Sequence, residues 1–175
     1  MTLDPQDEEL IHDGPRFSVH RATFRGGRTR EWVSAPASVA VVPYDRENVY
    51  LVRQPREAVG RDDVLEVPAG VMDVEGESAL QTAKRELREE IGMDADDWLE
   101  ATSFFASIGF TDEVVHVYLA TGLQKVAEPD ASGEEQIELV SWPLAELDGL
   151  IDGNADAKTL VGLLWLRRVL GDRLR

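Results

Sequence analysis

The stretch that decides the fold reads Ser78-Ala-Leu-Gln-Thr-Ala-Lys-Arg85-Glu-Leu-Arg-Glu-Glu90-Ile-Gly-Met93. Its apolar residues recur at spacings of three and four, which places them on one side of a helix. They are Leu80, Ala83, Leu87 and Ile91. Ser78 and Gln81 form a capping-box pattern at the start, and Gly92 is a natural C-cap. The sequence therefore predicts one amphipathic helix between Ser78 and Gly92.

An acidic edge lies beside the apolar stripe of this helix. Glu86 and Glu90 are four residues apart and face the same way, with Glu89 close to Glu90. Like charges at this spacing repel by roughly 0.2–0.5 kcal/mol per pair, so a cation must compensate them. Hard divalent cations prefer such oxygen ligands, and the chain has no cysteine. A plainer interpretation is equally open here: Lys84, Arg85 and Arg88 could neutralise a solvated, charge-rich helix.

A longer string that includes this helix resembles the Nudix box. The string is Gly70-Val-Met-Asp-Val-Glu-Gly-Glu77, followed after seven residues by Arg85-Glu-Leu-Arg-Glu-Glu-Ile-Gly-Met93. The family pattern is a Gly, five residues, a Glu, seven residues, then Arg-Glu-U-x-Glu-Glu-x-Gly-U, where U is bulky and aliphatic. Every fixed position from Glu77 onward is met, but Gly70 lies one residue too far from Glu77. The loop therefore carries a one-residue insertion.

The resemblance implies a role for each matching residue. Glu86 and the catalytic Glu90 would be the main metal ligands, with Glu89 and the carbonyl of Ala69 as further ligands. Glu77 and Arg85 would hold loop and helix together through an ion pair, and Gly70 would be structural. The implied cofactor is Mg²⁺ or Mn²⁺, which would bind pyrophosphate oxygens and activate a water.

Segments outside the box are similar to ADP-ribose pyrophosphatases. They are Leu51-Val-Arg-Gln-Pro-Arg56, Leu65-Glu-Val-Pro-Ala-Gly70, Gly109-Phe-Thr-Asp-Glu113 and Val117-Tyr-Leu-Ala-Thr-Gly-Leu123. The similarity implies that Arg56 contacts substrate phosphate and that Glu66 lies near the nucleotide. Without it, Arg56 is an ordinary surface arginine and Glu66 a strand-end carboxylate.

The general base of this subgroup lies on an acidic loop well after the box. Gly133-Glu-Glu-Gln136 fits that description, and we expect Glu135 to be the base, with Glu134 as the second choice. One residue departs from the subgroup, because Ile108 stands where a proline is expected about fifteen residues past the box. The choice of substrate is therefore less constrained than the class of reaction.

Three functions remain compatible with the sequence. The first is hydrolysis of ADP-ribose, or a related nucleoside diphosphate sugar, to AMP (or NMP) and a sugar phosphate. The second keeps the reaction but uses nucleoside triphosphates or dinucleoside polyphosphates. The third is a non-catalytic nucleotide sensor, which the intact Glu86, Glu89 and Glu90 disfavour.

Composition limits the partners of the protein. The formal net charge is -16 over 175 residues, which argues against binding nucleic acid or anionic lipid through a basic surface. No apolar run is long enough to span a bilayer, and the segment from Met1 to Leu10 is acidic where a secretory signal would be basic. We therefore expect a cytoplasmic protein, and the resemblance implies that its partner is a small nucleoside diphosphate.

The alternation of strands and helices predicts an α/β fold, with a mixed sheet between helices in an α/β/α sandwich. Residues 37–175 would form the Nudix domain, and residues 1–36 a loose arm (1–15) followed by strands that support a homodimer. We expect a central hairpin of 37–42 with 49–53. Further strands are expected at 17–24, 30–33, 64–67, 100–106, 114–120 and 137–143, and helices at 144–151 and 158–170.

Overall fold

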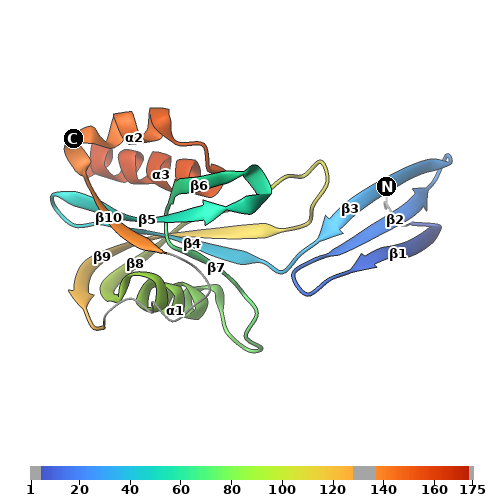
Figure 1. Cartoon of the computed structure of the whole chain (residues 1–175), viewed down its shortest axis with the longest axis horizontal. Coiled ribbons are helices and arrows are strands. Elements are labelled where there is room, and N and C mark those ends of the chain that lie inside the picture. The colour runs from blue at the N-terminus through green and yellow to red at the C-terminus, as the bar shows by residue number, and fades with distance from the viewer. Residues whose placement is uncertain (1–4, 128–136, 174–175) are drawn as a thin grey trace.

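The computed structural model of the chain describes residues 5–127 and 137–173. Two sheets lie between helix α1 on one side and helices α2 and α3 on the other, and a third, N-terminal sheet extends to the side (Figure 1). The helices are α1 (Ala79–Ile91), α2 (Leu147–Gly153) and α3 (Ala157–Arg173). The strands are β1 (Asp7–Asp13), β2 (Ser18–Phe24), β3 (Arg28–Ser34), β4 (Ser38–Pro43), β5 (Asn48–Arg56), β6 (Arg61–Glu66), β7 (Ala69–Val71), β8 (Met93–Phe105), β9 (Val114–Lys125) and β10 (Glu138–Pro143). The predicted α/β/α sandwich is confirmed.

Helix α1 begins and ends where its sequence predicts. The Ser78 side chain accepts a hydrogen bond from the backbone N–H of Gln81, and the Gln81 side chain accepts one from the backbone N–H of Ser78. Gly92 ends the helix with φ of 68°, a left-handed conformation that favours glycine. Ala83, Leu87 and Ile91 of the apolar stripe are buried, and Leu80 is partly buried. These local signals fix where the acidic edge starts and which way it faces.

The predicted central hairpin is wrong. Strands β4 and β5 are joined by a tight turn, but only one isolated bridge, Tyr44 to Val49, connects them. Strand β4 instead pairs in parallel with β9 and antiparallel with β7, in a sheet ordered β7-β4-β9-β8. Strand β5 lies in a second sheet, ordered β10-β5-β6. A short turn between two apolar runs predicts that they are neighbours, but burial on both faces allows β4 to pair with a distant strand.

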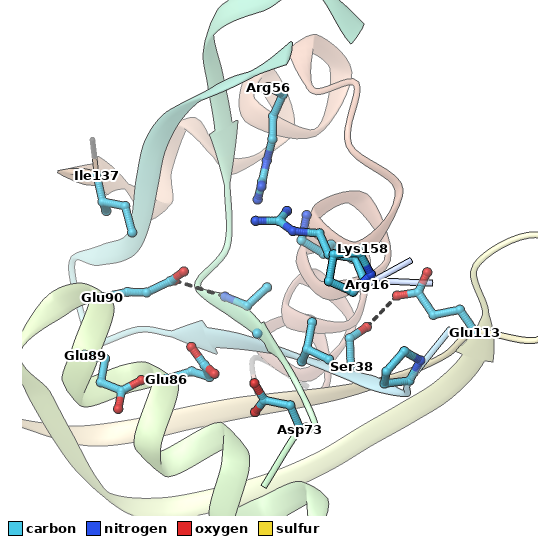
Figure 2. Close-up of a pocket in the computed structure, with 15 residues that line it drawn as sticks. Arg16, Ser38, Arg56, Asp73, Glu86, Glu89, Glu90, Glu113, Ile137 and Lys158 are labelled. Atoms are coloured by element: carbon cyan, nitrogen blue, oxygen red, sulfur yellow. Dashed lines mark hydrogen bonds between the residues drawn. The ribbon is translucent and has the colours of Figure 1, made fainter. Parts of the chain in front are cut away.

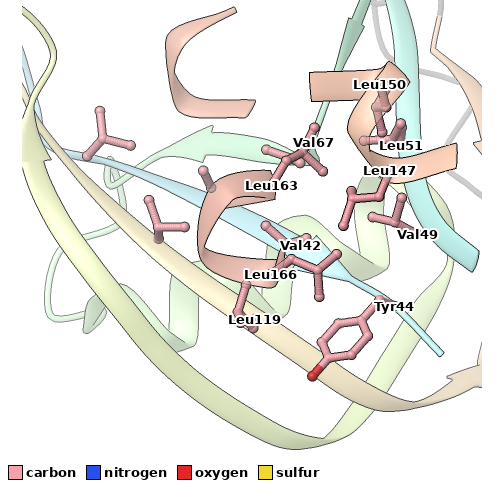
Figure 3. Packing of buried hydrophobic residues seen from close by; sticks show 13 residues of the cluster. Val42, Tyr44, Val49, Leu51, Val67, Leu119, Leu147, Leu150, Leu163 and Leu166 are labelled. Carbon is pink, nitrogen blue, oxygen red and sulfur yellow. The ribbon is translucent and has the colours of Figure 1, made fainter. Parts of the chain in front are cut away.

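The core has two layers because β4 is apolar on both faces. Val39 and Val41 pack toward α1, whereas Ala40 and Val42 pack toward α2 and α3. Figure 3 shows Leu163 and Leu166 of α3 packed in the second layer, near Val42 and Leu119. Cutting back one such leucine to alanine costs about 2–5 kcal/mol. The C-terminal helix is therefore an integral part of the domain.

The N-terminal sheet corrects a second expectation. Residues 1–15, which we expected to form a loose arm, include β1, and this strand pairs antiparallel with β2. Strand β3 pairs with the other edge of β2, so the sheet is ordered β1-β2-β3. Every residue of β1 is exposed, so it has no burial-driven alternation that the sequence could reveal. The sheet is attached to the rest of the chain by hydrogen bonds from the Val33 N–H to the Phe110 carbonyl and from Ser34 to Asp112.

In the part of the chain that the structure describes, no helix combines the length and apolar character needed to cross a membrane.

Candidate metal centre and substrate pocket

An open pocket of about 770 Å³ lies over the box helix, between the ends of the central strands and the start of α3. Figure 2 shows carboxylates of α1 on one wall and cationic side chains on the opposite wall. The lining residues are Pro15, Arg16, Pro36, Ser38, Arg56, Ala69, Gly70, Val71, Asp73, Glu86, Glu89, Glu90, Glu113, Ile137 and Lys158.

The acidic wall is built by the inner edge of α1. Glu86 and Glu90 are buried although they carry carboxylates, whereas Glu89 is more exposed. The Glu90 carboxylate accepts a hydrogen bond of 3.0 Å from the Ala69 N–H, which joins the helix to β7. Burial raises the pKa of Glu86, and the nearby Arg85 offsets only part of this effect. A cation in the pocket would therefore stabilise the charged form of Glu86.

Gly70 lets strand β7 pass directly beside this wall. A Cβ atom at residue 70 would lie 2.0 Å from Oε1 of Glu86, far inside contact distance. Val71 and Ala69, on either side, pair with Ser38 and Ala40 of β4, so the backbone cannot easily move away. The glycine is therefore needed for its lack of a side chain.

Arg85 pairs with four carboxylates of the box loop and helix, one of which is Asp73 at 3.4 Å. Its guanidinium lies 2.7 Å from Glu86, 3.0 Å from Glu89 and 3.4 Å from Glu77. Burial by itself would lower the pKa of Arg85, but these carboxylates together raise it. The loop that carries the extra residue ends in a turn before the helix, in which the Glu77 N–H bonds the Val74 carbonyl and Gly76 has φ of 84°. The insertion precedes Glu77, so the spacing that lets Glu77 reach Arg85 is intact.

The donors of the acidic wall suit a hard divalent cation, because they are carboxylate oxygens with a backbone carbonyl beside them. Within residues 5–127 and 137–173, no three acidic or histidine side chains lie close enough together to hold a metal ion as placed. In this arrangement the Arg85 guanidinium pairs with both Glu86 and Glu89.

The opposite wall carries Arg56 from β5, Lys158 from α3 and Arg16 from the segment before β2. Beneath them lies Glu66, whose side chain is only 2% exposed and does not line the pocket. Arg56 donates to Glu66 through Nε at 2.6 Å and through Nη2 at 2.9 Å, and Lys158 donates to the same carboxylate. Burial alone would raise the pKa of Glu66, but these two cations lower it below its ordinary value.

The structure brings together most of the residues that the sequence singled out. Glu86, Glu89, Glu90, Ala69, Gly70 and Arg56 line one pocket. Glu134 and Glu135 lie outside the described residues. Ile108 is 86% exposed and does not line this pocket.

Several pocket residues were missed by sequence reasoning. Arg16, Asp73, Glu113 and Lys158 line the pocket, and Ser38 donates a hydrogen bond of 2.8 Å to Glu113. Asp73 could have been found, because it lies within the box loop. Lys158 had no such signal, since nothing near the start of the last helix distinguishes it from a surface lysine.

Comparisons with known proteins agree with this geometry. The family model described as the NUDIX domain matches residues 34–162. A protein of Mycobacterium tuberculosis (strain ATCC 25618 / H37Rv) named ADP-ribose pyrophosphatase is 43% identical over 144 residues, which cover 79% of this chain and 69% of that protein. A Bacillus subtilis (strain 168) protein of the same name is 35% identical over 142 residues, covering 79% and 76% of the two chains.

A solved structure supports the same fold. The crystal structure of an ADP compounds hydrolase superposes with a TM-score of 0.84 at 22% identity, covering 99% of this chain and 96% of that one. The family model covers most of the chain, and its matched region includes the acidic helix together with Arg56 and Lys158 of the cationic wall. This chain therefore belongs to the Nudix family.

Proposed function

We propose that this Nudix hydrolase cleaves the pyrophosphate bond of ADP-ribose, or of a related nucleoside diphosphate sugar, giving AMP (or NMP) and a sugar phosphate. The observation that carries the proposal is the division of one pocket into an acidic wall, with Glu86 and Glu90, and a cationic wall, with Arg56 and Lys158. A diphosphate that enters a protein of net charge -16 needs local positive charge. Arg56 and Lys158 would supply it on one wall, and a divalent cation held by the glutamates would supply it on the other. The names of the two relatives favour a diphosphate substrate.

The acidic wall is proposed to bind Mg²⁺ or Mn²⁺. Glu86 and Glu90 would be the main ligands, with Glu89 and the Ala69 carbonyl as further donors. When bound, the cation would neutralise charge on the pyrophosphate and lower the pKa of water. The hydrogen bond from Ala69 to Glu90 and the guanidinium of Arg85 position the carboxylates before the ion arrives.

Hydrolysis adds water across a P–O–P bridge. One new P–O bond forms, one bridging P–O bond breaks, and a proton must leave the attacking water. We propose Glu135 as the acceptor, with Glu134 as the second choice; both fall within residues 128–136, outside the described part of the chain. Ile137, the next residue, lines the pocket, which supports a base delivered from this segment.

The proposed activity can be tested by incubating the protein with ADP-ribose and Mg²⁺ or Mn²⁺ and separating the products by chromatography. We expect AMP and ribose 5-phosphate, and no turnover when the metal is chelated. A parallel panel of nucleoside triphosphates and dinucleoside polyphosphates tests the substrate class. Turnover of these compounds without turnover of any diphosphate sugar would replace our substrate assignment.

The proposed role of Glu90 as a metal ligand can be tested with a single substitution. Glu90→Gln keeps the size of the side chain but removes a charge, so we expect a folded protein that loses roughly 100-fold or more in activity. Glu100→Gln, an exposed position on β8, is the matched control and should keep its activity. Unchanged turnover in Glu90→Gln would reject Glu90 as a ligand.

We also propose that the N-terminal sheet forms a homodimer contact with a second copy of this chain. Ala22 is the one buried residue of its three fully described strands. Leu10 and Phe17 are about half exposed, and a small sheet without a covered face is not stable alone. Light scattering tests this, and a monomeric mass at micromolar concentration would reject it.

A further inference from the structure

The geometry points to Lys158, on the C-terminal helix, as a substrate-contacting residue that binds a phosphate of the nucleoside diphosphate together with Arg56. In this arrangement Glu66 is a positioning residue that holds both cations, and it does not touch the substrate. The inference rests on the proposed function, because it assigns the residues that would grip the diphosphate in the same pocket.

The positions of the three side chains separate their roles. Lys158 and Arg56 both line the pocket, and their side chains are 20% and 36% exposed. Figure 2 shows both on the wall that faces the glutamates of α1. Glu66 lies behind them, with both carboxylate oxygens occupied: Oε1 accepts from Arg56, and Oε2 accepts from Arg56 and Lys158. A carboxylate so enclosed is suited to fixing cations and not to meeting a ligand.

The Lys158 ammonium keeps capacity for a ligand. It has three N–H donors and no acceptor. In the described part of the chain it pairs with Glu66 and lies 3.1 Å from Oδ2 of Asp156. Asp156 is also bound by the N–H and hydroxyl of Thr159, so it serves mainly as the cap of α3. Among the described residues nothing else is paired with it, so one donor of the ammonium remains for an anion in the pocket.

The start of α3 is held firmly against the strand that carries Glu66. The Val67 N–H donates to the Thr159 hydroxyl at 2.9 Å, and the Asn154 amide donates to the Leu65 carbonyl at 2.9 Å. These bonds lie on either side of Glu66 in sequence. They fix Lys158 in place before a substrate binds, which lowers the entropy cost of gripping it.

The competing explanation is that Lys158 only neutralises the buried Glu66. A counter-ion alone would affect stability, whereas a substrate contact affects KM and ligand affinity in the folded protein. We therefore expect Lys158→Gln to raise the KM for ADP-ribose by about 10- to 100-fold, the loss of one charge-assisted hydrogen bond, with a smaller change in kcat. Arg167→Gln, a cation of the same helix that pairs with Asp148 outside the pocket, should change neither value.

Binding of AMP, measured by calorimetry without metal, gives a readout that does not depend on turnover. We expect Lys158→Gln to weaken AMP binding by a similar factor. If the wild type fails to hydrolyse any diphosphate sugar, the proposed function fails, but weaker AMP binding in the variant would still support the phosphate contact. If the wild type is active and the variant keeps both its KM and its AMP affinity, the inference is overturned.

Lys158→Gln leaves Glu66 with one cation fewer and can compromise folding. The double variant Glu66→Gln/Lys158→Gln removes the buried charge together with its partner, so it is compared with Glu66→Gln alone. A KM about tenfold higher in the double variant supports the contact. Equal KM and equal AMP affinity in the two proteins overturn it.

Discussion

Gly70 lies against the carboxylate of Glu86 so closely that a Cβ atom on residue 70 would be 2.0 Å from the Glu86 Oε1. The strand that carries Gly70 and the helix that carries Glu86 are thus packed without space for a methyl group. This contact links the spacing of the box to the position of a proposed metal ligand.

Gly70→Ala should harm the site more than the fold. The new methyl group displaces the end of one flexible side chain, at a cost of about 0.5–1.5 kcal/mol in unfolding free energy, but it forces Glu86 out of its position. We expect weaker metal binding by calorimetry and at least a tenfold loss in kcat/KM. Gly149→Ala, where a Cβ meets no atom within 4 Å, is the control. Full activity in Gly70→Ala would show that Glu86 can move without consequence.

Glu66 should make the stability of the protein depend on pH on the acid side. Its pKa in the folded protein is below the ordinary value of 4.5, because Arg56 and Lys158 outweigh the effect of burial. The stability from the charged carboxylate is therefore fully present above pH 4.5 and is lost as the pH falls through the lower, folded pKa. We expect Glu66→Gln to lower the unfolding free energy at pH 7 by about 1.5–3 kcal/mol. Chemical denaturation from pH 7 to pH 3 should show the difference from wild type shrinking below pH 4.5; a constant difference would contradict it.

Tyr50 should titrate well above an ordinary tyrosine. Its hydroxyl donates a 2.7 Å hydrogen bond to Asp45, and this bond, with burial, raises the pKa of Tyr50 to about 12. The resulting stability is present below the ordinary pKa of 10.0 and is lost as the pH rises through about 12. Ultraviolet titration of wild type and Tyr50→Phe should assign a step near pH 12 to this residue. A step near pH 10 that disappears in Tyr50→Phe would refute the contact.

The contribution of the N-cap of α1 to the unfolding free energy can be measured with a substitution that lies outside the pocket. Ser78→Ala removes the side-chain acceptor for the Gln81 N–H and should cost about 1 kcal/mol in unfolding free energy. Ser78→Asp keeps a capping oxygen and should restore most of this loss, as measured by thermal or chemical unfolding. Equal stability of the alanine and aspartate variants would mean that the capping box contributes nothing.

The box helix could be predicted from the pattern of residues that are close together in the sequence. Its cap, its apolar stripe and its acidic edge depend on interactions among residues a few positions apart, such as Ser78 with Gln81, so the sequence predicts them directly. The inserted residue lies before Glu77, so it leaves the sequence spacing from Glu77 to Arg85 unchanged, and the two side chains pair at 3.4 Å. Strand β1 shows the limit of this approach, since fully exposed residues carry no burial pattern.

The pairing partners and the second wall of the pocket were decided only by the tertiary structure. Strand β4 pairs with the distant β9 and not with its neighbour β5, because both faces of β4 are buried between two helical layers. Glu66 and Lys158 are far apart in sequence, yet hydrogen bonds at the start of α3 bring them together. The sequence by itself determined the acidic helix because its order is local, whereas the cationic wall exists only once long-range packing places α3 against β6.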